Sequence, residues 1–95
     1  MNTKIVKVEN QELVNLIESL QYEVNARKEL ISFMLSTDMS MDTHAFERYN
    51  KEYMDFYIQY NEAKNQLQKM YVYTAVENPI SWNLDFETSE ITITF

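Results

Sequence analysis

His44 is the single histidine of the chain and stands near Asp42 and Glu47, in the first turn of an expected helix. A metal site or an acid–base catalyst would need partner side chains that converge on it from other elements. Di-metal sites in helical bundles place a glutamate three residues before a histidine on each of two helices. Here the order is reversed and occurs once, so we expect His44 to be exposed to solvent and to hold no metal.

Two residue types that carry much protein chemistry are missing, since the chain has no cysteine and no glycine. Without cysteine there are no disulfides, zinc–thiolate sites, iron–sulfur clusters or thiol nucleophiles. Without glycine there is no glycine-rich phosphate loop, which excludes the usual nucleotide-binding motifs. The carboxylates of the second expected helix are scattered around it: Glu47, Glu52, Asp55 and Glu62. We therefore predict no catalytic residue, no cofactor and a protein that is not an enzyme.

Aromatic and methionine side chains are the residues best suited to binding a partner. Tyrosine and phenylalanine recur at helical spacing in the second half of the chain, and core packing explains most of them. Some widen this stripe beyond the contact with one partner helix, and tyrosine is enriched at interfaces because its ring is apolar and its tip polar. With two residues of the C-terminal strands, the candidate partner-binding residues are Met54, Tyr57, Tyr71, Trp82 and Phe86. They would contact a protein or peptide partner, or a second copy in a homodimer that makes a four-helix bundle.

A first helix is expected over about residues 10–36. Its apolar residues are spaced alternately by four and three, as in the seam of a heptad repeat: Leu13, Ile17, Leu20, Val24, Ile31 and Met34. Asn10 is expected to cap this helix through its side-chain oxygen, and Glu12 lies favourably near the positive end of the helix.

Arg27 interrupts this seam. We expect it to extend its charge to solvent or to form an ion pair within the helical hairpin. Glu23 lies one turn before it, and the tyrosines of the second helix are further candidate partners. Ala26 and Leu30 lie beside Arg27 and are expected to take over its apolar contact.

A second helix is expected over about residues 42–73. Its apolar positions repeat at three and four without a break: Phe46, Tyr49, Tyr53, Phe56, Tyr60, Ala63, Leu67 and Met70. Asp42 is the expected N-cap, and Met41 is expected to pack on Phe46. Because a short polar turn joins two helices of similar length, they should form an antiparallel hairpin that crosses at about 20°.

Asn78 and Pro79 end the helical region, and residues 80–95 are expected to form a β-hairpin. Ile80, Trp82, Leu84 and Phe86 alternate with polar residues and give one wholly apolar face. With a loop at residues 87–90, the predicted cross-strand pairs are Phe86 with Ile91, Leu84 with Ile93, and Trp82 with Phe95. The apolar face is expected to lie on the helical hairpin.

Residues 3–8, TKIVKV, form a short β-type run and are a candidate third strand. The predicted fold is thus α+β and helix-dominated, a long two-helix hairpin with a C-terminal β-hairpin. A free strand edge of such a sheet is suited to recruiting an extended peptide by strand addition.

The 95 residues are expected to form one domain over residues 1–95, with no linker or repeat. The net charge of −7 argues against direct binding of nucleic acid or anionic lipid. No stretch approaches a membrane span and the N-terminus has no signal-peptide core, so we expect no membrane contact and a cytoplasmic location.

The helical hairpin and the final strands together resemble small accessory proteins of bacterial peptide-modification clusters. Those proteins accompany radical-SAM maturases that act on ribosomally made precursor peptides, including the CXXX-repeat systems. The matching stretch comprises Trp82, Leu84, Asp85, Phe86, Thr88 and Ile91. The resemblance implies a partner of a radical-SAM enzyme, itself non-catalytic, that helps to bind or present the precursor peptide, and it carries over no catalytic residue.

The sequence therefore predicts a non-catalytic binding or accessory protein, the partner of a peptide-modifying enzyme. One alternative is an acidic inhibitor of phage or plasmid type, which would bind a nucleic-acid-binding protein through its negative surface. The other is a self-assembling structural protein that uses its aromatic stripe to associate with itself.

Overall fold

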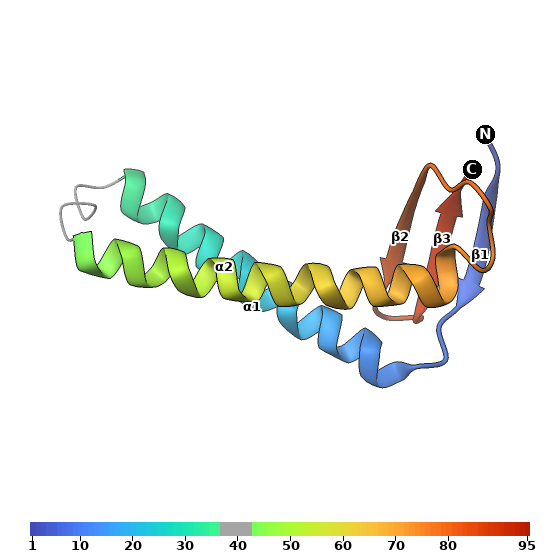
Figure 1. Cartoon of the computed structure of the whole chain (residues 1–95), viewed down its shortest axis with the longest axis horizontal. Helices are drawn as coiled ribbons and strands as arrows, with labels where there is room; N and C mark the ends of the chain where they lie inside the picture. Colours follow the sequence, from blue (N-terminus) through green and yellow to red (C-terminus); the bar gives the residue numbers. More distant parts are fainter. Residues whose placement is uncertain (37–42) are drawn as a thin grey trace. The chain divides into compact units, whose positions relative to one another are not determined.

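A computed structural model of the chain describes residues 1–36 and 43–95. In chain order the elements are β1 (Thr3–Lys7), α1 (Gln11–Ser36), α2 (Thr43–Leu67), a π-helical turn η2 (Gln68–Val72), β2 (Ser81–Asp85) and β3 (Glu90–Thr94) (Figure 1). The fold is α+β and helix-dominated, as the sequence predicts. The expected cap Asp42 and the packing of Met41 on Phe46 involve residues outside those described.

The chain divides into two compact units, which we describe separately. Unit 1 comprises residues 1–18 and 62–95, and therefore holds the sheet and the helix ends next to it. Unit 2 comprises residues 19–61, the remaining parts of α1 and α2.

The sheet of unit 1 has three antiparallel strands in the order β1-β3-β2. The candidate third strand is confirmed, because β1 pairs with β3 along its whole length, from Thr3 opposite Thr94 to Lys7 opposite Glu90. The last strand of the chain is therefore the central one. β1 and β2 are the two edge strands of the sheet.

The predicted register of the hairpin is wrong by two residues. Trp82 lies opposite Ile93 and Leu84 opposite Ile91, and the strands close at the pair Asp85 and Glu90. The loop is therefore residues 86–89, which begins one residue earlier than predicted. A shift by two residues preserves the face of every side chain, so the apolar set still faces the helices.

The turn itself explains this register. The Asp85 Oδ1 accepts the backbone N–H groups of Glu87 at 2.9 Å and Thr88 at 3.4 Å. Ser89 has a φ of 57°, in the left-handed region, and its N–H donates to the Asp85 carbonyl at 2.8 Å. Its buried hydroxyl bonds to Gln11 Oε1 at 2.7 Å, which ties the turn to the start of α1.

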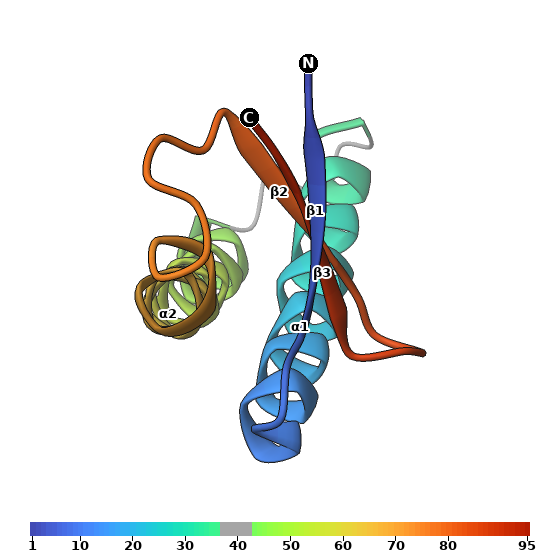
Figure 2. The same ribbon diagram turned by 90° about the vertical axis from the view of Figure 1, so that its right-hand side faces the viewer.

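The core of unit 1 lies between one face of the sheet and the helix ends. Figure 2 views the sheet from its β1 edge, so that β1 lies nearest the viewer and the other strands lie behind it. The buried apolar side chains of this unit are Val8, Leu13, Val14, Ile17, Ala63, Leu67, Val72, Val76, Ile91 and Ile93. Ile80 belongs to the predicted apolar face but is not part of this core. It precedes the first residue of β2, and 70% of its surface is exposed.

The start of α1 follows the sequence prediction. The Asn10 Oδ1 accepts the N–H of Leu13 at 3.1 Å, which makes Asn10 the N-cap, and Glu12 lies in the first turn. The predicted seam residues Leu13, Ile17, Leu20, Val24 and Met34 are buried, and Ile31 is half-buried.

Unit 2 is an antiparallel hairpin of the two helices (Figure 1). Arg27 packs across it, with its guanidinium carbon 4.2 Å from the centre of the Phe56 ring. It also forms an ion pair with Glu23, as predicted, and its Nε lies 3.6 Å from Glu52 Oε2. The prediction for Ala26 and Leu30 is wrong: both are exposed, because Arg27 itself packs on Phe56.

The end of the second helix departs from the predicted pattern at Met70, which is exposed. The π-helical turn widens the helix there, so the residues that follow Leu67 are rotated relative to a regular α-helix. Val72 becomes fully buried in place of Met70. The turn also changes where the adjacent side chains of Gln68 and Tyr71 lie.

Candidate functional site

The five candidate partner-binding residues lie in different units. Met54 and Tyr57 belong to unit 2, and Tyr71, Trp82 and Phe86 belong to unit 1. Neither unit gathers them all into one surface.

Met54 and Tyr57 are exposed on α2 of unit 2. The Tyr57 ring stacks on that of Tyr53, with centroids 5.8 Å apart, and Ile58 beside them is also exposed. These residues form an apolar patch on the solvent side of the helix.

Tyr71 is half-buried, and its hydroxyl accepts the backbone N–H of Asn10 at 3.3 Å. It therefore joins η2 to the start of α1. This bond makes Tyr71 part of the packing of unit 1.

Trp82 is half-buried on the helix-facing side of β2. Its indole N–H donates to Gln68 Oε1 at 3.1 Å, and the Lys64 ammonium lies 5.4 Å from the ring centre. Gln68, the first residue of η2, also bonds to the hydroxyl of Tyr73. The π-helical turn thereby positions one amide that holds both aromatic side chains.

The outer edge of β2 offers unpaired backbone groups. Asn2 and Phe95 exchange two backbone hydrogen bonds, of 2.7 and 2.9 Å. Because hydrogen-bonded pairs recur at every second residue of an antiparallel ladder, Ile93 and Ile91 also direct their backbone groups at β1. The alternate residues of β3 therefore bond to Ser81, Asn83 and Asp85. The N–H and C=O groups of Trp82 and Leu84 then point away from β3, and no strand of the described residues pairs with them.

A depression of about 590 Å³ lies at the C-terminal half of this edge. It is lined by Glu18 of α1 and by residues of β2 and its turn: Asn83, Leu84, Asp85, Phe86 and Glu87. Leu84 and Phe86 are half-buried and contribute apolar lining, while the carboxylates of Glu18, Asp85 and Glu87 contribute negative charge.

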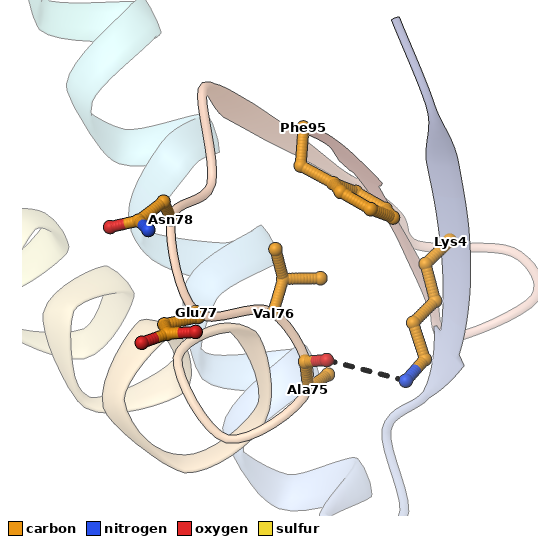
Figure 3. A pocket seen from close by; sticks show the side chains of 6 residues that line it. All are labelled: Lys4, Ala75, Val76, Glu77, Asn78 and Phe95. Carbon is orange, nitrogen blue, oxygen red and sulfur yellow. Dashed lines mark hydrogen bonds between the residues drawn. The ribbon is translucent and has the colours of Figure 1, made fainter.

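A second depression, of about 410 Å³, lies at the other end of the sheet (Figure 3). Val76 and Phe95 point toward its interior, whereas Glu77 and Asn78 point away from it. The Lys4 ammonium donates to the carbonyl of Ala75 at 3.3 Å. Lys4, the one cationic residue among the described residues that line this depression, is thus already bonded to the backbone. The polar side chains of the depression do not converge on one position.

His44, the residue considered for a metal or acid–base role, lies on α2. His44 is exposed, as predicted. Within residues 1–36 and 43–95, no three His, Asp or Glu side chains are arranged to hold a metal ion. None of the described helices combines the length and the hydropathy needed to cross a bilayer.

Comparisons with protein-family models, with curated proteins and with solved structures found no match to this chain.

Sequence reasoning singled out Trp82 and Phe86 but not the residues beside them. Glu18, Asp85 and Glu87 were missed because their proximity depends on the strand register and on the packing of α1 beside β2. The alternation of residues 80–86 placed Leu84 on the same face as Trp82 and Phe86, although Leu84 was not among the candidate partner-binding residues.

Proposed function

We propose that this protein is a non-catalytic accessory protein that binds an extended segment of a protein or peptide partner along the outer edge of β2. The observation that carries this proposal is the unpaired edge itself, where the backbone of Trp82 and Leu84 points outward beside half-buried apolar side chains. A segment that adds to such an edge gains affinity from main-chain hydrogen bonds and specificity from its side chains.

The two edges of the sheet differ in a way that favours β2. β1 carries Lys4 and Lys7, and lysine on an edge strand discourages further pairing. β2 has no lysine and no proline, and the exposed Ile80 precedes it. An incoming strand would therefore meet fewer obstacles at β2.

A role beside a peptide-modifying enzyme accords with this site. The residues of the C-terminal resemblance include Trp82, Leu84 and Phe86, which lie along the β2 edge or just beyond it. An edge of this kind holds a peptide in an extended form without acting on it chemically. Presentation of a precursor peptide to a maturase requires that property.

Proline substitutions test the proposal because they can remove one outward N–H without breaking the ladder. The probe is a short fluorescent peptide of alternating threonine and valine, followed by fluorescence anisotropy. We expect Leu84→Pro to remove binding, since its N–H points outward. The matched control is Ile5→Pro, which removes an outward N–H on the β1 edge and should leave peptide binding unchanged.

Circular dichroism establishes that both variants are folded, and backbone NMR of the unsubstituted protein is an independent measurement. The amide signals of Trp82 and Leu84 should shift when the peptide is added. Equal loss of binding in both proline variants, or shifts confined to β1 or to unit 2, would contradict the proposal. Pairing of two copies through β2 would appear as a dimer in the absence of peptide and would favour self-assembly instead.

A further inference from the structure

We infer that the β2 edge selects a segment that carries a lysine or arginine side chain, which enters the depression beside Leu84 and Phe86. This inference rests on the proposed function and names the chemistry of its ligand. It combines the unpaired edge with the shape and charge of the adjacent depression.

The depression joins two kinds of surface. Leu84 and Phe86 give it apolar lining, and Glu18 lines it from α1. Asp85 and Glu87 line it from β2 and the turn. A ligand side chain that leaves the edge at Leu84 therefore enters a depression that holds both apolar side chains and carboxylates.

Lysine and arginine match this combination of apolar and acidic lining, since each has an apolar stem and a charged end. The stem would lie along Leu84, and the cation would lie near the Phe86 ring and the carboxylates. An aliphatic side chain would contact Leu84 and Phe86 but would carry no charge to pair with the carboxylates. An acidic side chain would be repelled by three groups of its own sign.

The carboxylates are available to a ligand. Among the described residues, no lysine or arginine forms an ion pair with Glu18, Asp85 or Glu87. The Asp85 Oδ1 accepts two backbone N–H groups of the turn, so this residue also has a structural role. Glu18 and Glu87 are exposed and have no such role in the described contacts, which makes them the residues to substitute.

The experiment compares three versions of the threonine–valine peptide, with lysine, norleucine or glutamate at the central position. We expect the lysine peptide to bind about three- to tenfold more tightly than the norleucine peptide, as partly exposed ion pairs allow. The difference should shrink as salt is added, because exposed charges are screened. The glutamate peptide should bind most weakly.

The double variant E18Q/E87Q should remove the preference for lysine, so that the lysine and norleucine peptides bind to it with equal affinity. The matched control E62Q/E77Q changes the net charge equally, at exposed glutamates of unit 1 outside the depression. If the control removed the preference as fully as E18Q/E87Q, overall charge would explain it and the inference would be overturned. Equal binding of all three peptides would overturn the inference but leave the proposed function intact, whereas no binding of any peptide would contradict the proposed function.

Discussion

At the scale of single residues, Trp82 connects the sheet to the helical part of unit 1. Its indole bonds to Gln68 and its ring lies under the Lys64 ammonium. The ring is only half-buried, however, so it removes less apolar surface from water than an enclosed tryptophan does. Its contribution to folding should therefore be smaller than that of a tryptophan enclosed in a core.

Trp82→Ala should lower the free energy of unfolding by about 2–3 kcal/mol, below the range of about 3–5 kcal/mol for a fully buried tryptophan. Trp82→Phe keeps most of the ring and loses the indole hydrogen bond, so it should cost about 1 kcal/mol. Urea unfolding followed by circular dichroism measures both. The exposed Tyr22 provides a control, because Tyr22→Ala should change stability by no more than about 0.5 kcal/mol. A cost below about 1 kcal/mol for Trp82→Ala would mean that the hairpin does not pack on the helices.

Arg27 shows how a single residue can depart from a pattern without disturbing the element around it. The heptad seam predicts an apolar side chain there, and Arg27 was expected to extend its charge to solvent or to form an ion pair. The ion pair with Glu23 forms, and the guanidinium packs on the ring of Phe56. Its Nε is buried without a hydrogen-bond partner, because the Glu52 oxygen at 3.6 Å is too distant.

At the scale of elements, the turn after β2 determines the register of the whole hairpin. Asp85→Ala removes the acceptor of two backbone N–H groups and should cost about 1 kcal/mol of unfolding free energy. Asp85→Asn keeps a side-chain oxygen and is the matched control, with an expected loss of less than half of that value. Urea unfolding measures both variants. If the two lost stability equally, the negative charge of Asp85 would matter more than its hydrogen bonds.

The helices, the strands and their inward faces could be predicted from the sequence, because periods of 3.6 and 2 residues identify a buried face. Register could not, since the same face is kept when a strand slips by two residues. The deciding features were the Asp85 side chain and the left-handed Ser89, in a chain that has no glycine to mark such a position. Met70 was misplaced for a similar reason, because a π-helical turn adds a residue that the heptad pattern does not reveal.

The candidate site was predictable only in its general nature. Alternation in the C-terminal residues indicated an apolar strand and a free edge suited to strand addition. Which strands form the edges depends on β3 being central, and this follows from long-range pairing that local patterns do not contain. The depression beside Leu84 likewise needs Glu18, which is distant in sequence.

At the scale of the whole molecule, burial is unequal between the two units. Of the described residues, the largest fully buried side chains all belong to unit 1. In unit 2 the described core is smaller, and consists of Leu20, Val24 and Met34 with the half-buried aromatic residues of α2. Local stability follows buried apolar contact, so the units should open independently.

Hydrogen exchange measured by mass spectrometry or NMR should therefore be slower in unit 1. We expect the amides of β3 to exchange at least about tenfold more slowly than those of α1 within residues 19–36. Comparable protection throughout both units would mean that they unfold as one cooperative structure.

The central position of β3 also sets the order of events when the ribosome makes this chain. β1 is synthesised early, but its pairing partner leaves the ribosome only after both helices and β2. Until then, the apolar side chains of Val8, Val14 and Ile17 have no sheet to cover them. The helical hairpin of unit 2 can form from local contacts in the meantime, whereas unit 1 must await its last strand. A chain released before β3 would lack the centre of its sheet, and quality control by cellular proteases would recognise the exposed apolar surface.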